Sequence, residues 1–246
     1  MITKDNLKIL LVQFRHAESM KNHERENVAR SANVALPQVK VLSALSEPLD
    51  DDIYDCSDLI VLGGSGDYSI FADLACMPKL KSWVRRALKE DKPLLGSCLG
   101  AQFMAEFLGG EVVTDPNLEE IGSMAVSLTK EAESDPLFFD YPEDFMAQIG
   151  HQQTIIQIPQ GAKLLAKTDK AIHAFAWPGS SLYAMQFHPE LTKKGMVDRI
   201  IHHRDGYASD PVEYHRIINT ATESPYTDNI IEKYIDRVAL PRVNKN

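Results

Sequence analysis

This chain has no apolar run long enough to span a membrane, little cysteine and no excess of basic residues. A transmembrane helix needs roughly 20 consecutive apolar residues, and no run in the sequence approaches that length. The N-terminal segment, Met1 to Asn6, carries charge but no apolar stretch behind it, so we expect no secretory signal. The formal net charge of -9 argues against broad binding to nucleic acid or to an anionic membrane.

The three cysteines, Cys56, Cys76 and Cys98, show no metal-ligand spacing and cannot all pair as disulfides. Reduced thiols fit the cytoplasm, so we expect a cytoplasmic protein. The sequence contains no internal repeat, no low-complexity tract and no linker that demands a domain boundary. We therefore expect a single domain over residues 1–246, with a core from about residue 8 to 190 and a helical tail from about 191 to 246.

Strand-like apolar runs alternate with helical patterns through the first half of the chain. The expected strands are Lys8 to Phe14, Val39 to Leu42, Asp58 to Leu62 and Pro93 to Leu95, and the expected helices are Ala17 to Asn33, Pro78 to Lys92 and Ala101 to Leu108. Continuous apolar strands separated by helices indicate a parallel sheet with helices on both faces. The pattern predicts a three-layer α/β fold with a mostly parallel sheet, flavodoxin-like or Rossmann-like.

After Glu111-Val112-Val113 the pattern of apolar segments and turns differs from that of the first half. Short strand-like segments separated by polar or Gly/Pro turns follow at Gly122 to Leu128, Asp144 to Ile149, Lys163 to Ala166, Ala171 to Trp177 and Ser181 to Phe187. They predict additional, partly antiparallel strands. Helical patterns return at Lys194 to His203, Pro211 to Thr220 and Asp228 to Val238.

A cysteine lies between two glycines where a strand should turn into a helix. The run is Gly96-Ser97-Cys98-Leu99-Gly100, directly after the Pro93 strand and before the helical pattern. This is the shape of a nucleophile elbow, whose glycines leave room for a strained backbone. The helix N-terminus should lower the pKa of the Cys98 thiol and favour the thiolate. A structural Gly-Ser-Cys turn is the alternative.

A reactive cysteine needs a base, and the base needs an acceptor that orients it. Gln186 to Glu190, with the sequence Gln-Phe-His-Pro-Glu, offers both after an apolar run. Residues two apart in extended backbone point to the same side, so His188 and Glu190 can form a chain from carboxylate through imidazole to thiol. The alternative is an exposed strand-end histidine beside a surface glutamate.

Acyl transfer also needs donors for the developing oxyanion. The N–H of Leu99 follows the nucleophile, and Gly63 to Gly66 follows the Asp58 to Leu62 strand. The carboxyl ends of parallel strands lie along one edge of a sheet, so these two loops can converge there. A phosphate-binding loop or a plain turn is the rival interpretation, although the loop lacks both a G-x-G-x-x-G pattern and a Walker lysine.

Residues 96–102, Gly63-Gly64 and Gln186 to Glu190 together resemble the class I glutamine amidotransferases, especially the GMP-synthetase-type glutaminase domain. Glu120-Ile121-Gly122 is also similar to that subgroup, and the resemblance covers Lys8 to Glu190. It implies a Cys-His-Glu triad that releases ammonia from the side-chain amide of glutamine through a γ-glutamyl thioester. No metal and no organic cofactor is implied.

By that resemblance Cys98 is the nucleophile, His188 the base and then the acid, and Glu190 the group that orients His188. Gly64 and Leu99 would supply the oxyanion N–H groups. Gln102 would help to hold the substrate. These roles follow from the resemblance, residue by residue.

One departure from the subgroup bears on the substrate. The chain has Gly-His-Gln-Gln at residues 150–153, where the subgroup typically has Ser-His-Gly-Asp with an aspartate that helps to bind the substrate's α-amino group. Gln153 cannot offer a full negative charge, which leaves the amide donor open between glutamine and another γ-glutamyl compound. His151 lines the pocket by this alignment, or it is a structural or solvated loop histidine.

The favoured function is a cysteine-dependent amidase that passes ammonia from glutamine to a separate acceptor enzyme, since only a helical tail follows Glu190. A γ-glutamyl amide or peptide hydrolase working alone and a non-catalytic partner protein are the alternatives. An α/β-hydrolase also has an elbow but usually places its acid before the histidine, whereas here Glu190 follows His188. The segment from Arg15 to Glu18 follows the first strand; a surface loop is the favoured interpretation, and a segment that reaches the active edge of the sheet is the alternative.

Overall fold

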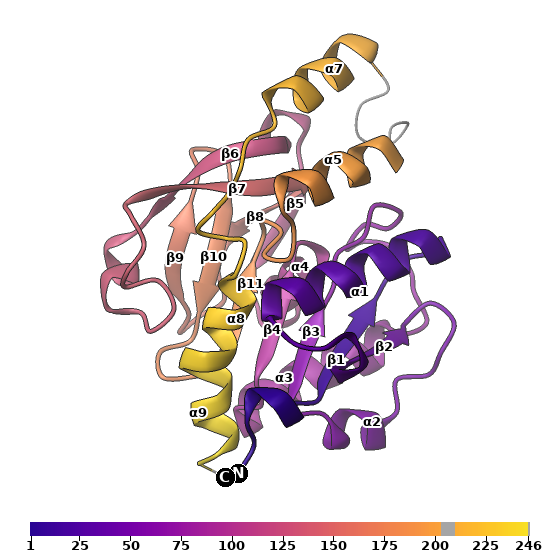
Figure 1. Cartoon of the computed structure of the whole chain (residues 1–246), viewed down its shortest axis with the longest axis vertical. Coiled ribbons are helices and arrows are strands. Elements are labelled where there is room, and N and C mark those ends of the chain that lie inside the picture. Colours follow the sequence, from indigo (N-terminus) through magenta and orange to yellow (C-terminus); the bar gives the residue numbers. More distant parts are fainter. Residues whose placement is uncertain (203–209, 246) are drawn as a thin grey trace.

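A nine-stranded sheet forms the centre of the part of the chain that the computed structural model describes, residues 1–202 and 210–245 (Figure 1). One half is parallel, in the order β2 (Val39–Ser43), β1 (Ile9–Gln13), β3 (Leu59–Leu62), β4 (Leu94–Ser97) and β11 (Leu182–Met185). The sheet continues antiparallel through β10 (Ile172–Ala176), β9 (Lys163–Lys167), β6 (Glu120–Leu128) and β7 (Asp144–His151). The predicted α/β fold with added antiparallel strands is confirmed.

Helices cover both faces of the parallel half. The α-helices of the described residues are α1 (Glu18–Ala32), α2 (Asp51–Cys56), α3 (Met77–Glu90), α4 (Leu99–Phe107), α5 (Lys193–His202), α7 (Pro211–Thr220), α8 (Ile230–Tyr234) and α9 (Leu240–Val243), of which α7 packs on the antiparallel strand β6. Successive residues of β1 point to opposite faces, so Ile9 and Leu11 join one core while Leu10 and Val12 join the other. The first core includes Val28 of α1, and the second is packed by α2, α3 and α4. The three-layer prediction therefore holds.

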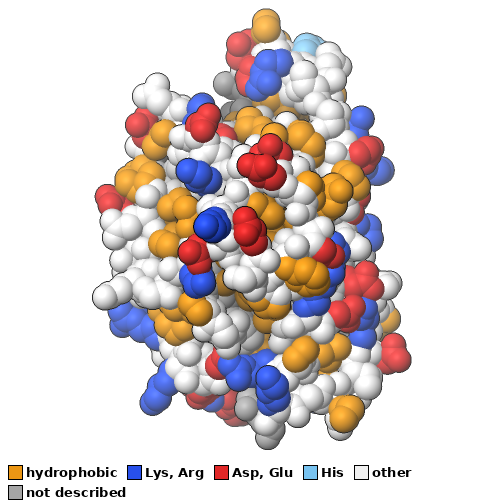
Figure 2. All heavy atoms as spheres, turned by 90° about the vertical axis from the view of Figure 1, so that its left-hand side faces the viewer, with side chains coloured by type: hydrophobic (Ala, Val, Ile, Leu, Met, Phe, Trp, Pro, Cys, Tyr) orange, Lys and Arg blue, Asp and Glu red, His pale blue; other side chains and the backbone are white. Residues whose placement is uncertain are grey.

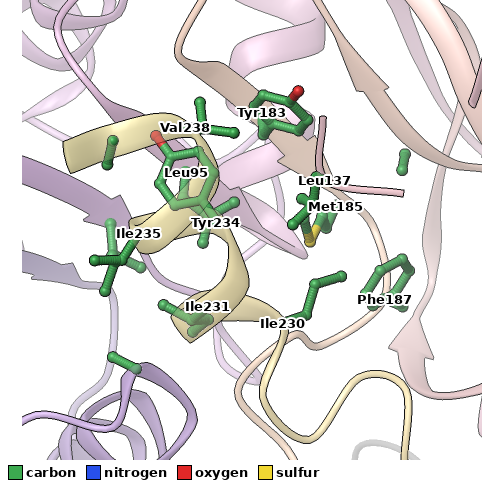
Figure 3. Packing of buried hydrophobic residues seen from close by; sticks show 14 of the residues in the cluster. Leu95, Leu137, Tyr183, Met185, Phe187, Ile230, Ile231, Tyr234, Ile235 and Val238 are labelled. Carbon is green, nitrogen blue, oxygen red and sulfur yellow. The ribbon is translucent and has the colours of Figure 1, made fainter. Parts of the chain in front are cut away.

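The C-terminal segment packs into the first of these cores. Ile231, Tyr234 and Ile235 lie against the residues of β4 and β11 (Figure 3). Tyr234 is fully buried, and its hydroxyl donates to the carbonyl of Ser181 at 2.6 Å. The two ends of the chain lie side by side, and the N–H of Ile2 donates to Oδ1 of Asn244 at 2.8 Å (Figure 1). Residues 191–246, expected as a helical tail, thus contribute to the core through their described part.

The main difference from the expected elements is a second, two-stranded sheet. β5 (Glu111–Thr114) pairs with β8 (Gln153–Gln157) in antiparallel fashion and stands apart from the main sheet. The β8 strand was not predicted, because it has polar residues at both ends and buries only Thr154 and Ile155 between them. His203, the expected end of a helix, lies outside the described residues.

The surface carries mixed charge on the side shown in Figure 2, where acidic and basic side chains are interspersed among apolar ones. No helix in residues 1–202 and 210–245 is both long enough and apolar enough to cross a membrane.

Candidate active site

Cys98 occupies a sharp turn between β4 and α4. Its backbone φ is 49° and its ψ is −104°, a combination that few residues with a side chain adopt. A Cβ atom at position 100 would lie 2.1 Å from the carbonyl oxygen of Leu62, and one at position 96 would lie 2.7 Å from Sδ of Met104. Both glycines are therefore required for close packing of α4 on the sheet, and the predicted elbow is confirmed.

The Cys98 thiol is buried and lies among hydrogen-bonding groups. It donates to the carbonyl oxygen of Gly150 at 3.5 Å, and Nε2 of Gln186 donates to the sulfur at 3.8 Å. Burial, followed by the charge of Glu190, raises the pKa of the thiol to about 12, although the N–H of Leu99 acts in the opposite direction. The expectation of a lowered pKa is wrong for the unliganded site, because one helix N-terminus does not offset this burial. The sulfur is therefore a neutral thiol near pH 7 and must give its proton to a base before it can attack.

His188 and Glu190 follow β11 and form a buried pair. Nδ1 of His188 lies 3.0 Å from Oε1 of Glu190, and Ser97, beside the cysteine, donates its hydroxyl to Oε2 of Glu190 at 2.8 Å. Although burial opposes ionisation, His188, Arg199 and Ser97 hold the pKa of Glu190 far below its ordinary value. Burial and the charge of Arg199 lower the pKa of His188, although the charge of Glu190 acts to raise it. The imidazole is thus a neutral group at neutral pH, as a proton acceptor must be.

Neighbouring strands and α1 fix this segment in place. The N–H of His188 donates to the carbonyl of Gln148 on β7 at 2.8 Å. From α1, Ser31 donates to the carbonyl of Pro189 at 2.9 Å and Arg30 to that of Glu190 at 2.7 Å. The backbone around the pair is therefore held on both sides.

The side chains of Cys98 and His188 both lie next to Gly64 and Gly150. A Cβ atom at Gly64 would lie 3.2 Å from Cε1 of His188 and 3.5 Å from Cβ of Cys98. A Cβ atom at Gly150, whose carbonyl accepts from the thiol, would lie 3.8 Å from Nε2 of His188. The fold thus assembles Cys98, His188, Glu190 and Gly64, which belong to three separate segments of the sequence.

Sequence reasoning missed Arg199, whose guanidinium lies against both His188 and Glu190. Its Nη1 is 2.9 Å from Nδ1 of His188 and 3.1 Å from Oε1 of Glu190, and its side chain is only 3% exposed. Arg199 lies on the same face of α5 as the buried Met196 and Ile200. Arg199 could have been recognised from the sequence, because it is an arginine on the apolar face of a helix that follows the His-Pro-Glu segment.

A second buried ion pair holds the loop that contains Gly64. The N–H of Gly64 donates to Oε1 of Glu24 at 3.1 Å, and Arg15 donates to the same oxygen at 3.0 Å. Both charged side chains are 1% exposed. Arg15 was expected in a surface loop, and that expectation is wrong: the guanidinium compensates the buried charge of Glu24. The Gly64 N–H is engaged in this structure, whereas the N–H of Leu99 is directed to the sulfur.

A cavity of about 200 Å³ opens beside the sulfur. Its lining comes from residues 65–69, 150–153, Cys98, Leu99 and Gln102. The three expected substrate-binding residues, Gln102, His151 and Gln153, all lie in its wall. Nε2 of Gln102 donates to the carbonyl oxygen of Gln153 at 2.7 Å and to Oε1 of Gln186 at 3.3 Å, which joins two sides of the wall.

Comparisons with known proteins agree with this geometry. The family model for glutamine amidotransferase class-I matches residues 4–204. The chain is 34% identical over 146 residues to a glutamine-hydrolyzing GMP synthase subunit of Sulfurisphaera tokodaii, a match that covers 58% of this chain and 72% of that one. It is 30% identical over 172 residues to the GMP synthase of Malacoplasma penetrans, covering 67% of this chain but only about a third, 32%, of that longer protein.

Solved structures show the same fold. The crystal structure of a glutamine amidotransferase from Thermotoga maritima matches with a TM-score of 0.74 at 22% identity, over 95% of this chain and 98% of that one. A glutamine amidotransferase from Methylobacillus flagellatus matches with a TM-score of 0.71 at 20% identity, over 94% of this chain and 95% of that one. Since the family model spans residues 4–204 of 246, this protein is an enzyme of the class-I glutamine amidotransferase family.

Proposed function

We propose that Cys98, His188 and Glu190 hydrolyse the side-chain amide of glutamine through a γ-glutamyl thioester, and that the ammonia passes to a separate acceptor enzyme. The observation that carries this proposal is the buried thiol on a strained turn, which shares neighbouring glycines with an imidazole that is paired to a carboxylate. One of the relatives is a subunit of a glutamine-hydrolyzing GMP synthase, which supports a synthetase as the class of acceptor.

The chemistry follows from the proton positions. Nε2 of His188 takes the proton from Cys98, and the thiolate attacks the carboxamide carbon to give a tetrahedral oxyanion. The imidazolium then protonates the leaving nitrogen, ammonia departs, and water attacks the thioester with His188 again as base. Glu190 fixes the ring of His188 and stabilises its charged form.

The oxyanion needs N–H donors, and we assign the first to Leu99, at the N-terminus of α4. We propose that Gly64 supplies the second after its N–H exchanges from Glu24 to the substrate oxygen. Such an exchange leaves the buried carboxylate of Glu24 paired with Arg15 and with Gln13, whose Nε2 lies 3.0 Å from Oε2. The ion pair thus compensates Glu24 throughout the reaction.

Arg199 should set the pH at which His188 becomes a competent base. Replacing Arg199 with methionine removes the positive charge that lowers the pKa of His188, so that pKa should rise. Because the neutral imidazole is the active form, the acidic limb of kcat/KM should move to higher pH, by on the order of 1 pH unit. The measurement is glutaminase activity against pH, with the same data for Arg199→Lys.

Arg199→Lys keeps a positive charge and should keep the limb close to its original position. Arg237→Met is the matched control, since Arg237 pairs with Asp140 on the surface. A folded Arg199→Met enzyme whose acidic limb stays in place would contradict the role given to Arg199.

The missing aspartate at position 153 leaves the substrate's ammonium group without its usual partner in the family. Asp67 lines the same cavity as Gln153 and carries a carboxylate. We propose that Asp67 takes over recognition of the α-amino group, which keeps glutamine as the donor. A charge-assisted hydrogen bond of this kind contributes to binding more than a neutral one does.

This assignment predicts that Asp67→Asn raises the KM for glutamine roughly tenfold with little change in kcat. Gln153→Asp in the same chain should restore the KM, because it returns a carboxylate to the cavity wall. Steady-state kinetics with glutamine and with γ-glutamyl peptides measure both effects. Unchanged KM values in Asp67→Asn would refute the role of Asp67. Hydrolysis of the peptides but not of glutamine would replace the proposed function with a γ-glutamyl hydrolase.

A further inference from the structure

Three buried side chains of types that can bind a metal ion converge beside the catalytic cavity. Glu120 begins β6, His151 ends β7, and His173 lies on β10. One ligand atom from each lies within 4.8 Å of the other two, and the side chains are 5%, 0% and 0% exposed. The proposed glutaminase chemistry uses neither Glu120 nor His173, so it does not explain why these residues are buried together.

The separations suit a tetrahedral ion. Oε2 of Glu120 lies 3.2 Å from Nε2 of His151 and 2.9 Å from Nε2 of His173. Zinc binds imidazole nitrogen and carboxylate oxygen at about 2.0–2.2 Å, which places neighbouring ligand atoms of a tetrahedron about 3.3 Å apart. Small side-chain shifts would therefore admit the ion. Sheet pairing supports the geometry, since Glu120 and His151 are direct partners across β6 and β7.

The hydrogen bonds around His151 are compatible with metal ligation through Nε2. The hydroxyl of Thr154 lies 3.2 Å from the carbonyl oxygen of Leu118 and 3.4 Å from Nδ1 of His151. In the tautomer in which Nδ1 carries the hydrogen and donates to Thr154, Nε2 presents its lone pair toward Oε2 of Glu120. This is the tautomer that a metal ion between the two groups requires.

The surroundings resemble the outer shell of a metal site. Nδ1 of His151 is oriented by Thr154, and the hydroxyl of Thr168 lies 3.2 Å from Oε2 of Glu120. Hydrogen bonds of this kind orient the ligands of metal sites. Glu120 and Thr168 also line a separate cavity of about 340 Å³, which gives an ion and its water ligand a way in.

We propose that Glu120, His151 and His173 bind one Zn²⁺, with water in the fourth position. The ion would fix His151 and with it the wall formed by residues 150–153, including the Gly150 carbonyl that accepts from Cys98. The site is separate from the triad and takes no part in the proton transfers. The proposal does not depend on the proposed function, since metal content is measured without turnover.

The test is the zinc content of the full chain after removal of metal with a chelator, incubation with Zn²⁺ and gel filtration. We expect about one zinc per chain, and a substituted Co²⁺ should give the absorption of a tetrahedral N/O site. His173→Gln should lose both signals. His215→Gln is the matched control, because His215 is an exposed histidine on α7.

Two further variants keep the outcome clear. Glu120→Gln keeps the side-chain size and removes the charged ligand, so it should also lose zinc if His173→Gln proves unstable. Cys98→Ala should keep its zinc, which separates the cluster from adventitious binding at the thiol. The proposal is overturned if the wild-type chain holds no stoichiometric zinc, if Cys98→Ala loses it, or if His173→Gln and His215→Gln bind equal amounts. Hydrogen bonds from the two histidines to Glu120 would then account for the cluster.

Discussion

Replacing Cys98 with alanine should abolish glutamine hydrolysis, lowering kcat at least ~10⁴-fold. The sulfur forms the covalent bond in the proposed mechanism, and no other thiol lines the cavity among the described residues. Losses of this size occur when the nucleophile of a triad is removed, because the base then has nothing to activate. Ammonia release from glutamine measures the effect, and the mass of the chain after treatment with a glutamine-analogue electrophile shows where the bond forms.

Cys56→Ala is the matched control, since Cys56 is an exposed free cysteine at the end of α2. It should keep full activity and still take up a single equivalent of the electrophile. Cys98→Ala should take up none. Retained activity in Cys98→Ala, or an adduct on Cys56 or Cys76 alone, would eliminate Cys98 as the nucleophile.

Gly100→Ala should have the largest effect on folding, because the added methyl group meets backbone rather than a side chain that can move. The new Cβ would lie 2.1 Å from the carbonyl oxygen of Leu62 and 2.7 Å from its carbonyl carbon, so α4 must shift away from β3. Overpacking of this kind costs roughly 3 kcal/mol of unfolding free energy. The shift would also move the N–H of Leu99 from the sulfur. Urea denaturation and ammonia release report the two effects.

Gly195→Ala offers a matched comparison in another helix, α5. Its Cβ would meet only side-chain atoms, 3.0 Å from Oδ1 of Asn27 and 3.1 Å from Cδ2 of Leu191. Those groups can turn aside, so we expect a change in unfolding free energy below about 1 kcal/mol. Equal stability losses in the two variants would show that the contact at Gly100 is not as tight as described.

The local pattern of the chain was sufficient to predict the parallel half of the sheet and the elbow. Strand β1 was predicted because every residue from Ile9 to Gln13 is buried, which produces a continuous apolar run with one polar end. The elbow was recognisable because a strained cysteine requires glycines within a few residues, and these are neighbours in sequence. His188 and Glu190 were predictable as a pair because they are two residues apart. The extended backbone expected between them is wrong, since the segment is a turn in which the N–H of Leu191 donates to the carbonyl of His188 at 3.3 Å.

Predictions failed where a contact joins residues far apart in the chain. β8 has only a short apolar run, and its partner β5 lies about 40 residues earlier in the sequence, so the pairing depends on the tertiary fold. The pKa of Cys98 depends on its burial, which the neighbouring residues do not reveal, and burial there outweighs the helix N-terminus.

The sequence by itself thus determined the α/β architecture and predicted a nucleophile, a base and an orienting acid, because the cysteine elbow and the His-Pro-Glu segment are each short-range patterns. Only the tertiary structure decided the electrostatics around them. It brought Arg199 against His188 and Glu190, paired Arg15 with Glu24 at the N–H of Gly64, and gathered Glu120, His151 and His173 beside the cavity. These groups come from separate elements, and the cost of burying a charge or an imidazole is compensated only by partners that folding brings together.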